Sequence, residues 1–257
     1  MTRTVDLNAD MGESFGAWSL GDDAGLLDIV TSANIACGYH AGDPDVMAAT
    51  MKNAVAKDVG IGAHPGFPDL QGFGRRRMSV PNATLANMVR YQLGAAQAMA
   101  RAAGGEVRHL KLHGALANMA SEDVAMARAC YQAALSVDPE IIVMVLAGTA
   151  QQQAAQELGC KTACEVFADR AYNDDATLVD RSLPGAVIHD PAEAGRRMVE
   201  MVREGAIITA SGKRIPARID TICLHGDTPA ALAIAAEVKI PPQSSGTKLA
   251  KFGGTRI

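Results

Sequence analysis

The sequence predicts an α/β protein whose strands form a seven-stranded parallel barrel. Apolar runs alternate with helix-like segments along most of the 257 residues, which is the pattern of parallel strands joined by right-handed helical crossovers. Four of the six histidines stand near the end of an apolar run, close to a glycine or proline. Three runs carry polar residues on one face, whereas buried strands of an open doubly wound sheet are apolar on both faces. A closed barrel with a polar interior is therefore favoured.

The predicted elements follow one another in regular order. Seven apolar runs are the predicted strands: residues 5–10, 32–37, 59–63, 107–113, 141–146, 161–166 and 221–224. Segments with helical patterns are the predicted helices: residues 20–30, 44–58, 82–103, 121–135, 149–158, 191–204 and 228–238. A hairpin is expected at residues 206–217. The segments that begin at residues 65 and 167 are long for simple connections, so we expect functional loops there.

Composition narrows the class of protein. An apolar fraction of 48% and a charged fraction of 20% are ordinary for one globular domain. The net charge of −4 offers no basic surface for nucleic acid or anionic lipid, and no apolar run has the roughly 20 residues of a membrane span. Five cysteines without a CxxC pair indicate reduced thiols and a cytoplasmic location. A homo-oligomer remains open.

The chain is predicted to divide at residue 240. Residues 1–240 contain every predicted strand and helix and form one barrel domain. Residues 241–257 are rich in glycine, serine and lysine and show no periodicity, so we expect a flexible or partner-bound tail.

The first predicted strand carries acidic residues toward the barrel interior. Its apolar residues must face the surrounding helices, so Asp6, Asn8 and Asp10 should point inward. Carboxylates in such an interior need polar partners or a metal ion. Lys111 is flanked by leucines and should also point inward, as a salt-bridge partner or as a clamp for a substrate anion. The clamp is slightly favoured.

The four histidines at strand ends are the strongest functional signal. If the strands are parallel, His40, His64, His113 and His225 converge at the end of the barrel where such folds carry their active sites. Any one of them alone could be a core histidine bonded to a backbone carbonyl, but four at matching positions favour an active site. His109 shares a face with His113 but lies about 13 Å away along a strand, so the two cannot bind one metal ion.

Charged residues in the connecting segments are less specific. Asp227 precedes a predicted helix start beside His225, and a helix N-terminus attracts phosphate or carboxylate. Arg75, Arg170 and Arg181 lie in the two long loops, where arginines are most often solvated. No G-x-x-x-x-G-K-[ST] or G-x-G-x-x-G motif opens a helix, so nucleotide chemistry would be unconventional or belong to a partner.

Seven motifs resemble those of the LamB/YcsF family. They are DLNADMGE at residues 6–13, NIACGYHAGD at 34–43, GAHPG at 62–66, GFGRR at 72–76, KLHGAL at 111–116, EVFADR at 165–170 and CLHGD at 223–227. The resemblance runs from about residue 4 to residue 240. Two positions depart from the family pattern, Leu112 where proline is usual and Ala117 where tyrosine is usual.

The resemblance implies both a fold and an activity. The fold is a seven-stranded β/α barrel of the glycoside hydrolase/deacetylase-like kind, related to polysaccharide deacetylases. The activity is the ATP-dependent opening of the lactam 5-oxo-L-proline to L-glutamate, with ATP as co-substrate and two further 5-oxoprolinase subunits, B and C, as partners. Phosphorylation of the lactam oxygen would create a leaving group. The reaction then needs a general base, an anion site and a clamp for the substrate carboxylate.

Roles in this chemistry can be assigned to the singled-out residues. Five are expected to be catalytic: Asp10, His40, His64, His113 and His225. Six are expected to bind substrate: Asn8, Glu13, Arg75, Lys111, Arg170 and Asp227. His113 would protonate the leaving nitrogen, and His225 with Asp227 would lie near phosphate. The sequence does not decide whether a divalent metal is bound; if one is, Asp10, His40 and His64 are the expected ligands.

Two other classes of function stay open. A metal-dependent, deacetylase-like hydrolase would be favoured by a divalent ion held by two of these histidines and an aspartate. A non-catalytic subunit of the same complex would be favoured if the complex kept its activity after mutation of the pocket.

Overall fold

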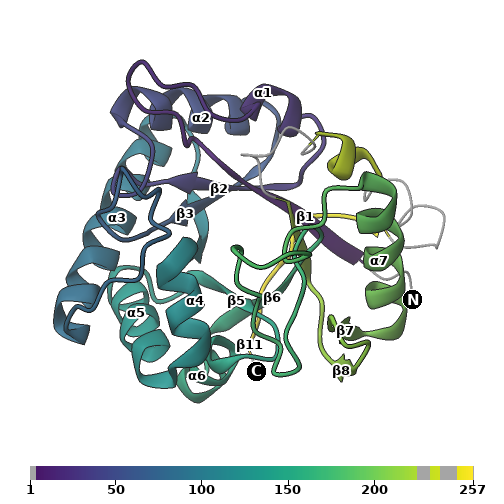
Figure 1. Cartoon of the computed structure of the whole chain (residues 1–257). Helices are drawn as coiled ribbons and strands as arrows, with labels where there is room; N and C mark the ends of the chain where they lie inside the picture. Colours follow the sequence, from purple (N-terminus) through teal and green to yellow (C-terminus); the bar gives the residue numbers. More distant parts are fainter. Residues whose placement is uncertain (1–3, 225–231, 238–247, 257) are drawn as a thin grey trace.

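The computed structural model describes residues 4–224, 232–237 and 248–256. Within them, seven strands form a closed barrel: β1 (Thr4–Met11), β2 (Ser32–Ala36), β3 (Gly60–His64), β4 (Val107–Lys111), β5 (Ile142–Leu146), β6 (Lys161–Phe167) and β9 (Thr221–Leu224). Consecutive strands of this series pair in parallel, and β9 pairs with both β6 and β1 (Figure 1). The predicted seven-stranded parallel barrel is confirmed.

Helices surround the barrel in the order that the sequence predicts. They are α1 (Asp23–Leu26), α2 (Pro44–Ala56), α3 (Asn82–Ala102), α4 (Gly114–Glu122), α5 (Val124–Val137), α6 (Ala150–Leu158) and α7 (Pro191–Glu204). The predicted hairpin is formed by β7 (Ala206–Ile208) and β8 (Arg214–Pro216). At the start of α2, Asp43 accepts hydrogen bonds from two backbone amides, and proline occupies the first turn.

One helix differs from the prediction. The single helix expected at residues 121–135 is two helices, because the extended backbone of Asp123 ends α4 and its carboxylate caps α5. The missed helix α4 begins at Gly114, which has a positive φ of 52° and directly follows the predicted strand 107–113, although β4 itself ends at Lys111. A glycine immediately after a strand is a turn signal, and it concealed the helix that follows.

The barrel wall separates an apolar layer from a polar interior. Leu7 belongs to the large apolar core that lies between the strands and the helices. Its neighbours Asp6, Asn8 and Asp10 are equally buried and point to the opposite side of β1. The predicted inward direction of these three residues is confirmed by their hydrogen bonds to residues of other barrel strands.

The last described residues close the amino end of the barrel. β10 (Lys248–Leu249) pairs with the start of β1, and β11 (Thr255–Arg256) pairs with the start of β6. Between them, Phe252 is buried in a small apolar cluster with Ile142, Met144 and Ala163. Residues 248–256 therefore contain two short strands and a buried phenylalanine that the sequence does not predict, while residues 241–247 lie outside the described part. The division at residue 240 remains a prediction.

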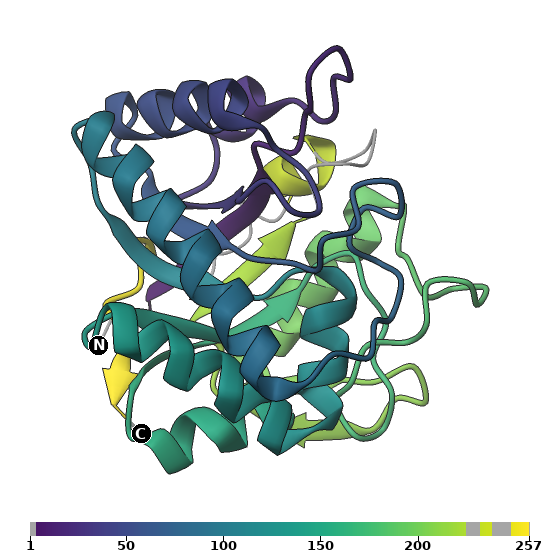
Figure 2. The same ribbon diagram turned by 90° about the vertical axis from the view of Figure 1, so that its left-hand side faces the viewer.

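The long loops lie at the opposite end. Figure 2 shows the connections after β3 and β6, residues 65–81 and 168–190, on the side of the molecule away from β11. These loops and the carboxyl ends of the strands frame the region where the histidines were expected. None of the described helices is long and apolar enough to cross a membrane.

Candidate functional site

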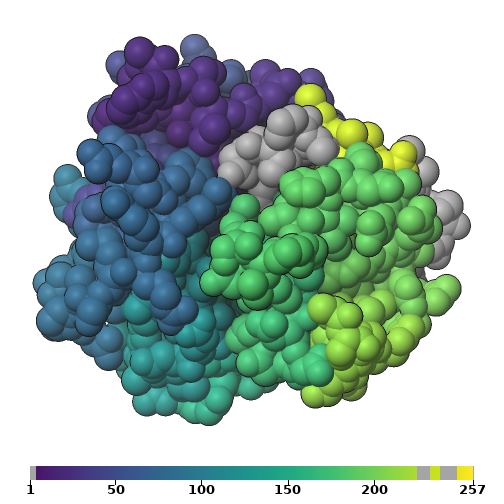
Figure 3. All heavy atoms as spheres, viewed as in Figure 1, coloured from purple at the N-terminus to yellow at the C-terminus, as the bar shows by residue number. Residues whose placement is uncertain are grey.

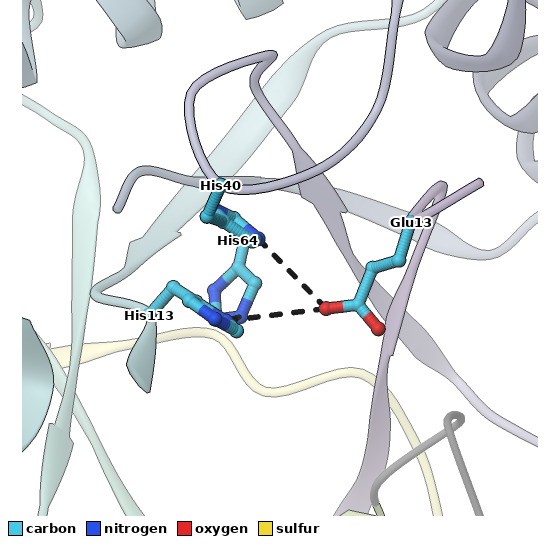
Figure 4. Close-up of side chains that lie close together, drawn as sticks. All are labelled: Glu13, His40, His64 and His113. Atoms are coloured by element: carbon cyan, nitrogen blue, oxygen red, sulfur yellow. Dashed lines mark hydrogen bonds and ion pairs between the residues drawn. The ribbon is translucent and has the colours of Figure 1, made fainter. Parts of the chain in front are cut away.

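Three of the predicted histidines meet at the carboxyl end of the barrel. His40 follows β2, His64 ends β3, and His113 follows β4, while Glu13 reaches the same place from the end of β1 (Figure 4). All four side chains are buried. One potential ligand atom from each lies within 4.8 Å of the others. The structure therefore assembles a compact group of three imidazoles and one carboxylate, here called the histidine centre.

Distances within the histidine centre suit a metal ion. Glu13 Oε1 lies 3.8 Å from His40 Nε2 and 3.9 Å from His113 Nδ1 (Figure 4). His113 Nδ1 lies 3.0 Å from His64 Nε2. The rings of His40 and His113 stack at 3.6 Å. Four ligands at about 2 Å from a tetrahedral zinc ion are separated from one another by roughly 3.3 Å, so small adjustments would bring these atoms into coordination.

Backbone carbonyls fix the orientation of two of the rings. His64 Nδ1 lies 2.8 Å from the carbonyl oxygen of Lys111, and His113 Nε2 lies 2.8 Å from that of Phe73. A ring nitrogen beside a carbonyl carries the proton, so in a neutral imidazole the other nitrogen presents its lone pair. The two facing nitrogens, His64 Nε2 and His113 Nδ1, would then repel each other. A proton or a metal ion between them is required.

His40 has the clearest unmet need for a partner. Both of its ring nitrogens are buried, and neither has a hydrogen-bond partner among the residues that the structure describes. Leaving a buried polar atom without a partner costs about 1–3 kcal/mol, so such atoms call for an explanation. Burial, followed by nearby histidines, lowers the pKa of His40 and of His113 well below the usual value. Both rings are neutral at pH 7, which is the form that binds metals.

An ion-pair network lies directly below the histidine centre. Lys111 Nζ is 2.8 Å from Asp10 Oδ1 and 2.9 Å from Glu165 Oε1. Burial alone would lower the pKa of Lys111, but Asp10, Cys223 and Glu165 together raise it well above its usual value. The inward direction predicted for Lys111 is confirmed, and its ammonium has two carboxylate partners. Asp10 Oδ2 also lies 3.3 Å from His64 Nε2 and connects the network to the histidine centre.

The expected metal-ligand set needs a correction. The sequence suggested Asp10, His40 and His64, whereas the residues within ligand distance of one another are Glu13, His40, His64 and His113. The chain turns at Gly12, whose φ is +66°, and this turn carries Glu13 across to the histidines. Asp10, which lies earlier on β1, pairs with Lys111 instead. Alternation along a strand gives the direction of a side chain but not the course of the loop that follows.

A cavity of about 410 Å³ opens above this floor. Its walls come from the loops after β3 and β6 and from the first turns of α4. Figure 3 shows the loop surfaces, blue for residues 65–81 and green for residues 168–190, meeting over the barrel mouth. Four arginines line the cavity: Arg75, Arg77, Arg170 and Arg181. The sequence pattern gave no role to Arg77 or Arg181, although the lengths of the two loops were a signal.

Other predicted residues lie elsewhere or outside the described part. Asn8 lies below the cavity, where its amide donates to Thr221 Oγ1 at 2.7 Å and its carbonyl accepts from Asn34 at 2.7 Å. It does not line the cavity, so a substrate contact by Asn8 is not supported. His225 and Asp227 fall outside the described residues. The catalytic and binding roles assigned from the sequence remain predictions.

His109 behaves as its position on β4 predicts. Its Nε2 lies 2.8 Å from Asn34 Oδ1, and its ring contacts Phe252 edge-on at 5.1 Å between centroids. Burial lowers its pKa to about 3, so it is neutral. It lies with the amino-end residues and not in the histidine centre.

Comparison with known proteins identifies the family. The sequence model of the LamB/YcsF family matches residues 5–256. The chain belongs to the LamB/YcsF family. The match continues past residue 240, so the resemblance includes the tail that the motifs left out.

Relatives within the LamB/YcsF family are similar over almost their whole length. The 5-oxoprolinase A subunit of Ruegeria pomeroyi is 69% identical over 98% of this chain and 99% of its own. The 5-oxoprolinase A subunit of Rhodopseudomonas palustris is 51% identical over the same shares. Among solved structures, the lactam utilization protein from Thermus thermophilus is 41% identical, with a TM-score of 0.90 over 97% of this chain and 100% of that chain.

Proposed function

We propose that this chain is the ring-opening subunit of an ATP-dependent 5-oxoprolinase, which converts 5-oxo-L-proline to L-glutamate. The full-length similarity to proteins named as the A subunits of 5-oxoprolinases supports the substrate. The histidine centre lies at the floor of a 410 Å³ cavity, and this observation supports the assignment of the ring-opening step to this chain. A purely structural subunit would gain no stability from three converging buried imidazoles, one of which has no hydrogen-bond partner among the described residues.

ATP and two further subunits complete the proposed reaction. A lactam carbonyl resists attack because resonance delocalises the nitrogen lone pair, and phosphorylation of its oxygen removes that resistance. Neither of the two common glycine-rich phosphate motifs occurs in the sequence. We therefore assign phosphorylation by ATP to the B and C partners and hydrolytic opening to this chain. A cytoplasmic location is consistent with an ATP-dependent reaction and remains a prediction.

A divalent metal ion fits the histidine centre. The orphaned nitrogens of His40, the facing lone pairs of His64 and His113, and the Glu13 carboxylate form a donor set of the kind that zinc prefers. A bound ion of this kind would lower the pKa of a coordinated water to about 7, which would make it a nucleophile at neutral pH. Glu13 and the three histidines would hold it.

Neighbouring residues supply the proton transfers. Asp10 lies beside His64, so it can accept the proton of the attacking water, and the Lys111 ammonium stabilises its charged form. Burial raises the pKa of Glu165, which lines the same cavity. A carboxyl group that holds a proton there can donate it to the ring nitrogen as the C–N bond breaks. The ring opening leaves an acyl phosphate, and a second water molecule then releases inorganic phosphate and gives glutamate. This role replaces His113 as the acid, because the Nδ1 of His113 is directed into the histidine centre.

Reconstitution tests the proposed function. The purified chain is mixed with candidate B and C subunits, 5-oxoproline and ATP, and glutamate is measured, with each component omitted in turn. We expect glutamate only from the complete mixture, and no 5-oxoproline-dependent ATP hydrolysis by this chain alone. Robust activity of the single chain would refute the partner requirement. Full activity without this chain would refute its catalytic role.

A metal-dependent amide hydrolase that needs no ATP is the second candidate. The observation in its favour is the donor set of the histidine centre, which would suit direct attack on an unactivated amide. The same reconstitution separates the two functions. Ring opening that continues without ATP and without partners would favour this second candidate.

A further inference from the structure

The cavity has two parts with opposite charge. Its floor carries three carboxylates and one ammonium: Asp10, Glu13, Glu165 and Lys111. Its wall carries four guanidinium groups and two carboxylates: Arg75, Arg77, Arg170, Arg181, Glu122 and Asp180. Counted as formal charges, the floor carries −2 and the wall carries +2, so a cation is favoured at the floor and an anion at the wall.

Arg75 lies near the histidine centre, behind the ring of Phe73. The preceding Gly74 has a φ of +62°, and a Cβ atom there would lie 2.7 Å from the Cβ of His40, so only glycine lets the loop pass this close. The guanidinium of Arg75 stacks over the ring of Phe73 at 4.8 Å. Phe73 itself contacts His113 edge-on at 5.3 Å between centroids. One aromatic ring thus separates Arg75 from the proposed catalytic groups.

Arg170 and Arg181 approach from the second loop. Arg170 is buried and donates hydrogen bonds to the carbonyl oxygens of Val179 and Ala186, which fixes the shape of the loop. Burial lowers the pKa of Arg170 to about 10, and the charges of Arg181 and Arg75 contribute in the same direction. Arg75, Arg170 and Arg181 thus line the same cavity, and the charges of Arg75 and Arg181 both act on the buried Arg170. Such an arrangement favours the binding of an anion among them.

The first turn of α4 adds to this field. Gly114 and Ala115 line the cavity, and the N-cap residue His113 makes no side-chain hydrogen bond to the helix. The positive end of a helix of nine residues therefore faces the same space as the arginines. The helix alone would not define a site, but here it points into the cavity that the three guanidinium groups line.

We propose that Arg75, Arg170 and Arg181 form a phosphoryl-binding subsite next to the histidine centre. A phosphoryl group has three acceptor oxygens and up to two negative charges, which matches several planar guanidinium donors better than a single carboxylate does. This inference rests on the proposed function. It places the phosphate of an activated lactam on the wall and its ring carbon above the floor. Phosphate recognition thereby falls on the two loops that follow β3 and β6.

Direct binding of inorganic phosphate to the isolated chain tests this subsite. The chain is treated with chelator and dialysed, so that no metal ion can take up the phosphate, and titrated calorimetrically. We expect saturable binding that weakens about tenfold to a hundredfold in Arg75→Met and in Arg181→Met. Arg101→Met, at the exposed end of α3, is the matched control and should bind phosphate like the wild type. Circular dichroism verifies that each variant is folded.

Three results would overturn the subsite. One is the absence of phosphate binding to the wild type at millimolar concentration. Another is equal weakening in Arg101→Met, which would indicate a non-specific charge effect. The third is weakened binding of 5-oxoproline without any phosphate binding, which would make the arginines a carboxylate clamp. Because no partner subunit or glutamate assay is involved, this test can fail while the proposed function stands.

Discussion

The two ends of the barrel interior are both polar and both buried, but their polar groups are treated differently. At the amino end, Asp6 accepts hydrogen bonds from Thr31 at 2.6 Å, Ser32 at 2.7 Å and Thr221 at 2.5 Å. At the carboxyl end, both nitrogens of His40 lack such a partner among the described residues. The amino end is closed by Phe252, whereas the other end opens into the cavity.

This difference separates structural polar residues from functional ones. Buried polar groups that are paired within the fold contribute specificity and stability, and they need nothing from outside. Buried groups that remain unpaired cost free energy, so each of them calls for an explanation. His40 lacks a partner at both ring nitrogens, whereas His109 and Arg108 at the amino end each lack a partner at one nitrogen and have one at another. Burial and polarity alone would have given Asp6 and His40 the same interpretation. Hydrogen-bond satisfaction distinguishes them.

The largest effect is expected from His40→Ala. Glutamate formation by the reconstituted complex should fall at least about a hundredfold, because the variant lacks one of the four groups that would hold the metal ion, and even residues behind such ligands contribute about 10- to 100-fold. The melting temperature should change little, because neither ring nitrogen of His40 forms a hydrogen bond with the residues that the structure describes. The exposed His189 is the matched control, and His189→Ala should be fully active. An unfolded His40→Ala protein would show that the histidine is structural.

Lys111→Met should affect stability more than substrate binding. The ammonium lies 2.8 Å from Asp10 Oδ1 and 2.9 Å from Glu165 Oε1, and its removal takes away the cation that both buried acids contact, which typically costs about 3–5 kcal/mol. In the variant, burial would raise the folded-state pKa of these acids, so stability is retained at low pH and lost as pH rises. Urea unfolding should therefore show a larger deficit at pH 8 than at pH 5. A stable variant with only a raised KM would instead make Lys111 a substrate clamp.

Phe252→Ala should destabilise the protein without changing its chemistry. The side chain fills the amino end of the barrel against Ile142, Met144 and Ala163, and loss of a buried phenylalanine costs about 3–5 kcal/mol. Thermal unfolding measures the loss, and Phe252→Leu should recover most of it. Glutamate formation per folded molecule should equal that of the wild type. A variant that is stable but inactive would connect the tail to the carboxyl end and contradict the separation of the two ends.

Asp6 should give the amino end a pH dependence of its own. Burial raises the pKa of Asp6 from 3.8 to about 6, despite hydrogen bonds from Thr221, Thr31 and Ser32 that lower it. Because the folded state binds this proton more tightly, the contribution is present below pH 3.8 and is lost as pH rises to about 6. The loss amounts to about 3 kcal/mol. Asp6→Asn should remove this pH-dependent loss, so the free energy of unfolding of the variant relative to wild type should improve between pH 4 and pH 7. The same difference in free energy of unfolding at both pH values would contradict this prediction.

The sequence predicts strand directions well because alternation is a local property. The period of two on β1 correctly places Asp6, Asn8 and Asp10 inside, and the same reasoning places Lys111. Depth along the barrel is not encoded in that period, so Asn8 was expected in the site although it lies below it. Depth depends on how the strands are staggered, which is a tertiary property.

Short elements and the courses of loops cannot be predicted from the sequence, because they too depend on tertiary contacts. The amino end is closed by two strands of two residues each and by Phe252. Segments this short cannot show a hydrophobic alternation that would predict a strand. The positive φ of Gly12 redirects the chain after β1, so that Glu13 and not Asp10 belongs to the histidine centre. The residue types therefore indicate the kind of chemistry, but the three-dimensional course of the loops determines which residues lie together in the site.

The central claim is that the histidine centre binds a divalent metal ion that the ring opening requires. The most direct measurement strips this chain alone with chelator, removes the chelator, and then assays glutamate formation with untreated partner subunits. We predict that activity is lost, that one equivalent of zinc per chain restores it, and that zinc does not restore His40→Ala. A fully active stripped chain would contradict the claim.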